Sequence, residues 1–276
     1  MRLVRAVLAV VACLAVTGCG AADAGAFPEG TAMARIQQRG VLTVGIKFDH
    51  PLFGFKDPAT GRITGFDAEI ARLVAKDLTG SERGIRFVET RPRQREDFLA
   101  RGVVDIVLAT YSITPERRRR VSFTEPYYYA DQDILVRADN KAIDEMTDLN
   151  GKRVCTATGS TSGDRLRHLV PKAKLTIVDI YSDCLPALQS RAIDAISTDD
   201  PILRGLLSQH PDRLKLVGKP FGSEPYGIGV RRGDTAFVAH LNALISRFLR
   251  DGQWDSVFMN TIGASGAVAD RARPRR

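Results

Sequence analysis

The chain has 276 residues, of which 44% are hydrophobic, so it can bury a sizeable core in one or two domains. Its formal net charge of +8 would suit a nucleic-acid partner, but two leader arginines and residues 270–276, with four Arg and one Asp, supply five of those charges. The other basic run, residues 117–120, has no interleaved aromatic residues, so we do not expect nucleic-acid binding.

The first 19 residues have the pattern of an export signal. Arg2 and Arg5 precede an apolar run at residues 6–16, which is too short to cross a bilayer. The following Val-Thr-Gly-Cys resembles a lipobox, which implies that Cys19 becomes a diacylated N-terminus; an ordinary signal with an incidental cysteine is the alternative. Residues 20–33 are small and polar and suit a flexible tether. We therefore expect an extracytoplasmic protein, anchored by lipid to the outer face of the cell membrane.

Strands and helices alternate after this tether. Predicted strands occupy residues 41–46, 85–89 and 105–109, and residues 134–137 are extended. The helix predicted at residues 67–78 has apolar side chains every third or fourth position, and Asp67 can cap it. A shorter helix at residues 95–100 ends before Gly102.

A second alternating set begins at Gly151. Strands are predicted at residues 153–157, 175–178 and 192–197, and helices between them at residues 162–170 and 184–189. Residues 226–230 form a further strand, and a helix at residues 235–250 ends near Gly252. Two such sets indicate an α/β fold with two lobes. Periodicity alone leaves open whether the C-terminal segment rejoins the first set.

The most specific pattern is DIVLATYSITPERRRRVSFTEPYYY at residues 105–129. A short buried strand leads into a turn with Thr110, Ser112, Thr114 and Arg117, and hydroxyl groups beside a guanidinium suit a carboxylate. A solvated turn before a basic helix start is the alternative. The order of the whole segment, including the later Phe-Thr-Glu-Pro-Tyr, resembles extracellular solute-binding proteins of family 3, the polar-amino-acid receptors of ABC importers.

This resemblance covers residues 34–262 and implies a type II periplasmic-binding fold. Lobe 1 would comprise residues 34–131 and 221–262, lobe 2 would be residues 132–220, and two hinge crossovers would join them around a ligand cleft. Residues 263–276 would remain as a disordered basic tail that can approach anionic lipid.

The resemblance also implies how an amino acid is held. Arg117 would bind the α-carboxylate, with Ser112 and Thr110 touching the backbone of the ligand. Thr110 departs from the commoner glycine or serine. In lobe 2, the turn Thr-Gly-Ser-Thr-Ser at residues 158–162 would present backbone N–H groups, with Ser160 and Thr161 near the ligand; a simple helix cap is the alternative.

A carboxylate is needed for the ammonium group of the ligand. Asp199 falls at the family's ammonium-binding aspartate, Asp200 is the competing choice, and a helix cap is the alternative for either. Lys47 and Arg95 fall where glutamate- and aspartate-type receptors place arginines on the side-chain carboxylate, although both side chains could be solvated.

Two features look like the actinobacterial glutamate-binding subgroup: Ala-Thr-Tyr-Ser-Ile-Thr at residues 109–114, and Cys155 together with Tyr-Ser-Asp-Cys at residues 181–184. The resemblance implies that Tyr181 contacts the ligand, and this residue stands where one branch of glutamate receptors has histidine. Phe53 lies where a ring normally covers the ligand, although core packing is the alternative.

Of the four cysteines, Cys13 leaves with the signal and Cys19 is the lipid site, so Cys155 and Cys184 remain. In an oxidising compartment we expect these two to form a disulfide; two buried free thiols are the alternative.

The sequence therefore predicts a monomeric, non-catalytic receptor without a cofactor. It would close on glutamate, or on aspartate or glutamine, and pass the ligand to an ABC permease and its ATPase. A dehydratase on the same fold would need a catalytic acid in the cleft, and we find no nucleophile–base pair or metal cluster that supports chemistry. A ligand sensor for a signalling partner is the third class.

Overall fold

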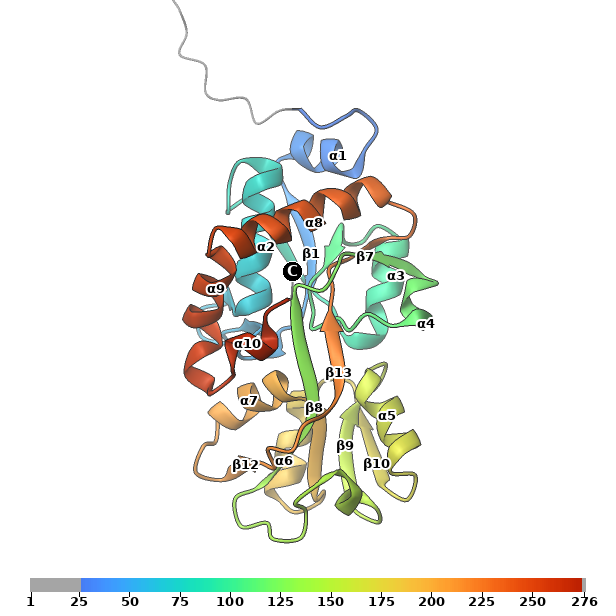
Figure 1. The fold of residues 1–276 in the computed structure, drawn as a ribbon, viewed down its shortest axis with the longest axis vertical. Coiled ribbons are helices and arrows are strands. Elements are labelled where there is room, and N and C mark those ends of the chain that lie inside the picture. The colour runs from blue at the N-terminus through green and yellow to red at the C-terminus, as the bar shows by residue number, and fades with distance from the viewer. Residues whose placement is uncertain (1–25, 275–276) are drawn as a thin grey trace, which may run out of the picture.

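The computed structural model describes residues 26–274 and has two α/β lobes, one above the other in Figure 1. The predicted signal and Cys19 lie outside the described residues. Within residues 26–274, no helix combines the length and the hydrophobicity that crossing a membrane would require.

Lobe 1 is built on a five-stranded sheet. Its strand order is β5 (Ile85–Glu89), β1 (Leu42–Ile46), β6 (Ile106–Val107), β14 (Gly229–Arg231) and β7 (Val121–Phe123). The first three strands are parallel, and β14 runs antiparallel to both its neighbours. Because β14 lies inside this sheet, the C-terminal segment does rejoin the first set of elements.

Helices cover this sheet. They are α1 (Ala32–Arg39), α2 (Phe66–Thr79), α3 (Arg95–Ala100), α4 (Pro115–Arg118), α8 (Thr235–Arg250) and α9 (Gln253–Thr261). Their apolar faces form one core with the sheet, in which Phe66, Tyr128 and Trp254 pack edge to face or at a tilt. A small antiparallel sheet of β2 (Asp49–His50), β3 (Gly54–Lys56) and β4 (Ile63–Thr64) lies beside α2.

Lobe 2 has a second sheet. Its strand order is β10 (Lys174–Val178), β9 (Arg153–Ala157), β11 (Ala195–Asp199), β8 (Tyr128–Arg137) and β12 (Leu214–Leu216), and β13 (Phe221–Tyr226) also pairs with β8. Its helices are α5 (Thr161–Leu169), α6 (Cys184–Gln189) and α7 (Asp200–Ser208), with 3-10 turns η2 (Met146–Leu149) and η3 (Tyr181–Asp183). Two apolar clusters form its core.

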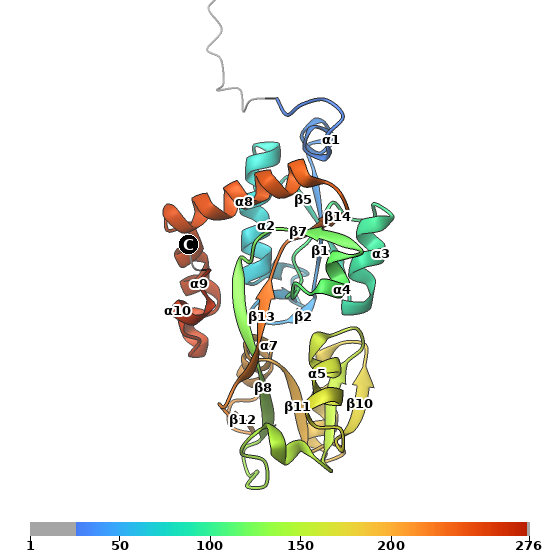
Figure 2. The same cartoon turned by 45° about the vertical axis from the view of Figure 1, so that its right-hand side comes forward.

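Two strands link the lobes. The long β8 and the shorter β13 run side by side between them in both views (Figures 1 and 2). They pair antiparallel from Tyr226↔Tyr128 to Phe221↔Gln132, with a register irregularity between Phe221 and Glu224. Such an irregularity weakens a ladder and permits bending. The two predicted crossovers are therefore this strand pair.

Asp67 does not cap α2 as predicted, because Gly65 occupies the N-cap position with φ 114°. The carboxylate of Asp67 instead turns inward and accepts hydrogen bonds from the Thr110 N–H, at 2.9 Å, and the Tyr127 hydroxyl, at 2.6 Å. The prediction of an N-cap from the local sequence is wrong here because Thr110 and Tyr127, which are distant in sequence, bind the Asp67 carboxylate instead.

The prediction of a disordered tail is wrong for residues 263–274. They form η4 (Gly263–Ser265) and α10 (Ala269–Ala272), and Ala272 is 3% exposed against the core of lobe 1. Arg273 donates to the Leu249 carbonyl at 2.9 Å and pairs with Asp255 at 3.1 Å. The basic composition hid the small apolar residues that pack this segment against α8, α9 and β8.

Candidate ligand-binding site

A small cavity of about 20 Å³ lies where the two lobes meet. Eight of the ten predicted ligand-binding residues line it: Arg95, Thr110, Ser112, Arg117, Ser160, Thr161, Tyr181 and Asp199. The structure adds further lining residues that the sequence did not single out: His50, Pro92, Ser162, Thr198 and Ile202. Larger hollows of about 480 and 340 Å³ are lined by lobe 1 alone.

Arg117 reaches the cavity from the start of α4. Thr114 caps this helix by accepting from the Arg117 N–H, which fixes the base of the side chain. One guanidinium nitrogen, Nη1, donates to the Ser112 carbonyl in the same lobe at 2.7 Å. The other, Nη2, donates across the cleft to the Gly159 carbonyl of lobe 2 at 3.0 Å.

Arg95, at the start of α3, has the same arrangement. Its Nε and Nη1 donate to the Pro92 and Ala109 carbonyls of lobe 1, at 3.1 and 3.2 Å. Its Nη2 donates to the same Gly159 carbonyl, at 3.4 Å. Burial, and then the nearby charge of Arg117, lower the pKa of Arg95 to about 10. Two buried guanidinium groups therefore converge on one carbonyl oxygen of the opposite lobe.

Tyr111 and Glu96 support these two cations, and the sequence signalled neither. The Tyr111 ring lies under both guanidinium groups, 4.3 Å from Arg95 Cζ and 5.2 Å from Arg117 Cζ. Its hydroxyl donates to Glu96 Oε1 at 2.7 Å, and that oxygen is 3.6 Å from Arg117 Nε. Burial alone would raise the pKa of Glu96, but the Arg95 charge and the Tyr111 hydrogen bond lower it, so Glu96 is a counter-ion.

Thr110 holds an uncommon backbone conformation for a β-branched residue, with φ of 46°. Its N–H donates to the buried Asp67 carboxylate, and burial raises the pKa of Asp67 to about 6. This turn places the Ser112 carbonyl where Arg117 binds it. The positive φ of Thr110 therefore carries strain, and the hydrogen bond to Asp67 helps to hold this conformation.

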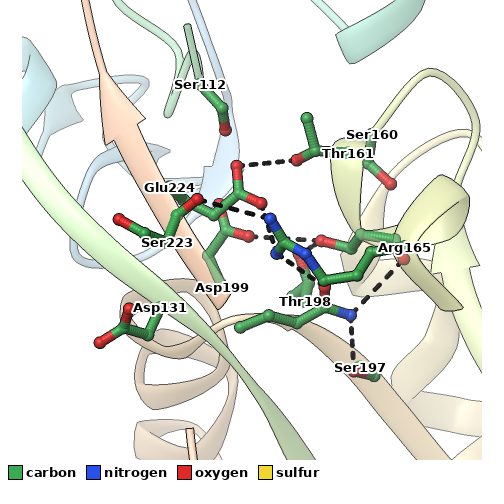
Figure 3. Close-up of polar contacts among 12 residues, drawn as sticks. Ser112, Asp131, Ser160, Thr161, Arg165, Ser197, Thr198, Asp199, Ser223 and Glu224 are labelled. Atoms are coloured by element: carbon green, nitrogen blue, oxygen red, sulfur yellow. Dashed lines mark hydrogen bonds and ion pairs between the residues drawn. The ribbon is translucent and has the colours of Figure 1, made fainter. Parts of the chain in front are cut away.

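In lobe 2, the turn before α5 brings Gly159 to the cleft. Gly159 has φ of 75°, and a Cβ there would lie 3.1 Å from the Arg93 backbone, so this close approach of the lobes needs glycine. The Ser160 hydroxyl caps α5 by accepting from the Gly163 N–H. The Thr161 hydroxyl donates to Glu224 Oε2 at 2.9 Å (Figure 3).

Asp199 ends β11 and enters the cavity, with 4% of its surface exposed. It occupies the N-cap position of α7 but makes no capping hydrogen bond. Its carboxylate instead accepts from the Tyr226 hydroxyl and, at 3.3 Å, from Ser162 Oγ. Burial, followed by the charge of Glu224, raises the pKa of Asp199 to about 8. Among residues 26–274, no cation forms an ion pair with Asp199, although the more distant charge of Arg165 opposes part of this shift.

Asp200 lies outside the cavity. It accepts from the Asp131 N–H at 3.2 Å and pairs with Arg204 at 3.5 Å on the hinge side. Of the two competing aspartates, only Asp199 lines the cavity between the lobes.

The sequence profile described as "Bacterial extracellular solute-binding proteins, family 3" matches residues 42–263. The chain belongs to this family. The ABC transporter glutamine-binding protein GlnH of Bacillus subtilis (strain 168) is 34% identical over 262 residues, covering 93% of this chain and 95% of that protein. The glutamate-binding protein GluB of Corynebacterium efficiens is 33% identical over 276 residues, covering 96% and 92%.

Solved structures agree on the fold of this family 3 solute-binding protein. A cysteine-binding protein from Campylobacter jejuni is 28% identical with a TM-score of 0.83, covering 89% of this chain and all of that one. This confirms the type II periplasmic-binding fold. Both curated relatives are named as amino-acid-binding proteins, the first as part of an ABC transporter, and the chain is a solute-binding protein rather than an enzyme.

Two predicted ligand-binding residues of this solute-binding protein do not line the cavity. Phe53 is fully buried in lobe 1, where it packs against Phe66 and Tyr128. Lys47 Nζ is 3.3 Å from Asp49 Oδ1, with 1% of the lysine exposed, and burial lowers the pKa of Lys47. The other oxygen of Asp49 accepts from the Tyr181 N–H of lobe 2 at 3.1 Å, so this pair joins the lobes.

Arg165 of α5 connects lobe 2 to the linking strand β13 through an ion pair with Glu224. Its Nη1 is 2.6 Å from Oε1 of the buried Glu224, and both residues are labelled in Figure 3. The same nitrogen donates to Gln132 Oε1 at 3.1 Å. Gln132 in turn donates to Ser197 Oγ at 3.0 Å. Since Glu224 also accepts from Thr161, the start of α5 is tied to a hinge strand.

The predicted disulfide between Cys155 and Cys184 is confirmed. It joins β9, which leads to the Gly159 turn, to the start of α6, which follows Tyr181. The Tyr181 hydroxyl also lies 3.2 Å from Thr156 Oγ1. The bridge therefore links two segments of the cavity wall.

Proposed function

We propose that this solute-binding protein is the lipid-anchored, extracytoplasmic receptor of an ABC importer for acidic amino acids, with glutamate as its preferred ligand. Arg117 binds the α-carboxylate, Asp199 the ammonium group and Arg95 the side-chain carboxylate. Ser112, Thr110 and the turn at Gly159 complete the contacts to the ligand backbone. Relatives named for glutamine and for glutamate are similarly close, so the choice rests on the charges around the cavity.

The observation that carries the proposal is the pair of inward guanidinium groups. Within lobe 1, Arg95 donates through Nε and Nη1 and Arg117 donates through Nη1, and both extend Nη2 across the cleft to the Gly159 carbonyl. When the lobes part, that carbonyl leaves and both Nη2 groups lose their partner. Two carboxylates on one ligand replace it with charged acceptors, which are stronger than a neutral carbonyl.

Charge balance favours a dicarboxylate over its amide. Glu96 is the carboxylate that contacts Arg117 and the Tyr111 hydroxyl, whereas Asp199 faces the ammonium end. The charge of Arg95 contributes to lowering the pKa of Lys47, so Lys47 lies close enough to add positive potential behind Arg95, although Asp49 pairs with this lysine. Glutamine would leave one guanidinium underpaired in a buried site, which is costly.

Ligand entry requires movement. A cavity of about 20 Å³ has room for about one water molecule, so an amino acid enters only when the lobes separate. The β8–β13 pair, with its irregular register, is the hinge that permits this. Closure then brings Arg95 and Arg117 of lobe 1 towards Asp199 of lobe 2, so that binding and closure are coupled.

Calorimetry with glutamate and glutamine tests the proposal on wild type and Arg95→Ala. Removing one partner of a buried charge pair costs about 3–5 kcal/mol, or about two to four decades of affinity. We expect Arg95→Ala to lose glutamate affinity on this scale and glutamine affinity far less. Arg101→Ala is the control, because Arg101 ends the same helix, is exposed and pairs only with Asp97 at 3.3 Å among the described residues. Wild type that binds glutamine as tightly as glutamate would refute the acidic-ligand assignment.

A further inference from the structure

His50 is a buried polar residue in the cavity wall that has no part in the ligand contacts proposed for Arg95, Arg117 and Asp199. It ends β2, is 2% exposed and lines the cavity together with Arg95 and Tyr181. Neither of its ring nitrogens has a hydrogen-bond partner among residues 26–274. Buried polar atoms are nearly always paired in folded proteins, so two unpaired nitrogens at a binding cavity indicate a missing partner.

The imidazole is neutral at physiological pH. Burial, together with the charges of Lys47 and Arg95, lowers the pKa of His50 to about 4, although Asp49 opposes this shift. Nε2 lies 3.6 Å from Asp49 Oδ2, beyond hydrogen-bond distance, and that oxygen accepts from the Tyr181 N–H. A neutral ring offers one N–H donor and one acceptor nitrogen.

The backbone around His50 is tightly fixed, so the ring has a set direction. His50 pairs with Gly54 in the β2–β3 ladder, and a Cβ at Gly54 would lie 2.4 Å from the Lys47 carbonyl oxygen. On its other side, Asp49 is held by Lys47 and by lobe 2. The ring centroid is 6.2 Å from that of Tyr181. Rigid support of this kind is what a recognition residue needs.

We propose that His50 is a specificity-determining residue whose neutral imidazole donates a hydrogen bond to a side-chain oxygen of the bound amino acid. This rests on the proposed function, which places the ligand side chain beside Arg95. His50 then selects ligands whose side chain is long enough to place an acceptor oxygen at the imidazole N–H, whereas Arg95 selects ligands whose side chain is negatively charged. Glutamate and glutamine both present such an oxygen, and aspartate is one methylene too short to reach it.

Two variants separate hydrogen bonding from shape. His50→Phe keeps a ring of similar volume and removes both nitrogens, whereas His50→Gln restores a donor and an acceptor. We expect His50→Phe to weaken glutamate and glutamine binding at least tenfold and to leave aspartate binding within about threefold. His50→Gln should recover glutamate affinity to within about threefold of wild type. His168→Phe, on the exposed face of α5, is the control and should change nothing.

Competition binding against a tight ligand, with thermal melts of each variant, provides the measurement. His50→Phe that binds glutamate within threefold of wild type overturns the inference. So does an equal loss for glutamate and aspartate, or an equal loss in the Phe and Gln variants, because either shows a role in shape alone. Wild type that prefers glutamine would refute the acidic-ligand proposal and leave the His50 test intact, since both ligands carry the oxygen.

Discussion

Replacing Asp199 by Asn should make the protein more stable at pH 8 in ligand-free buffer and nearly abolish amino-acid binding. Burial and the charge of Glu224 raise the pKa of Asp199 to about 8, from an ordinary value of 3.8. Between these two pH values the unfolded chain has lost a proton that the folded protein still holds. Stability therefore falls as pH rises from about 4 to about 8.

The size of this effect follows from the gap between the two pKa values. Each unit corresponds to about 1.4 kcal/mol, so a gap of about four units sets a ceiling of roughly 6 kcal/mol. Opening of the lobes hydrates the carboxylate and limits the cost, so we expect about 1–3 kcal/mol. Asn keeps an acceptor for the Tyr226 hydroxyl, and its amide can donate to Ser162 Oγ. At about 2–4 °C per kcal/mol, the melting temperature should rise by roughly 2–12 °C.

Thermal melts at pH 4 and pH 8, with calorimetry against amino acids at pH 7.5, provide the assay. The gain in stability should be present at pH 8 and nearly vanish at pH 4, while affinity falls by about two to four decades because the ammonium loses its counter-ion. Asp200→Asn is the matched control and should keep its affinity within about threefold, since Asp200 lies outside the cavity. Unchanged affinity in Asp199→Asn, or an equal change in stability at both pH values, would refute this reasoning.

Three further predictions concern the lobe contacts, the disulfide and the anchor. Asp49→Asn should destabilise the protein by about 2–4 kcal/mol in denaturant melts, because it leaves the buried Lys47 charge unpaired. Adding Lys47→Met should restore part of the lost stability, and a double variant with no recovery would contradict the pairing. Reducing Cys155–Cys184, whose residues are 29 apart, should lower stability by about 3–4 kcal/mol, and an unchanged melt would argue against it. Cys19→Ala should release the protein from membranes into the medium, which immunoblotting of washed fractions would detect; retention after a high-salt wash would exclude a lipid anchor.

Local patterns predicted much of the secondary structure. The bounds of β5, α3, β9, α6 and α8 match the predicted ranges. These segments have clear periodicity and end at turn residues, so local propensity and burial agree. Local patterns did not indicate α1, α4, α7, α9, β7, β12 or the β2–β3–β4 sheet. Helix α7 begins at Asp200, inside the Asp-Asp-Pro segment that was interpreted as a ligand site, and Pro201 lies in its first turn, where proline is favoured.

The residues of the candidate site also fall into two groups, those that a local sequence pattern indicated and those that it did not. Hydroxyl groups and an arginine at the end of a strand marked residues 110–117, because the chemistry of that segment is contained in one short stretch. Glu96, Tyr226 and Glu224 gave no local signal, since each acts only through a partner distant in sequence. The sequence did contain a signal for the polar residues of β2, because Asp49 and His50 stand side by side shortly after a predicted strand and the chain has only four histidines.

The amino-acid sequence was sufficient for the α/β class, the two-lobed family fold, the disulfide partners and most of the residues around the cavity, because these depend on periodicity, composition and a contiguous motif. Tertiary structure was needed to show that Asp199 rather than Asp200 enters the cavity, that Lys47 pairs with Asp49, and that His50 lines the wall. Those facts depend on which side chains meet across the cleft, and therefore on β8 and β13 bringing two lobes together. A short-range pattern carries no information about such contacts.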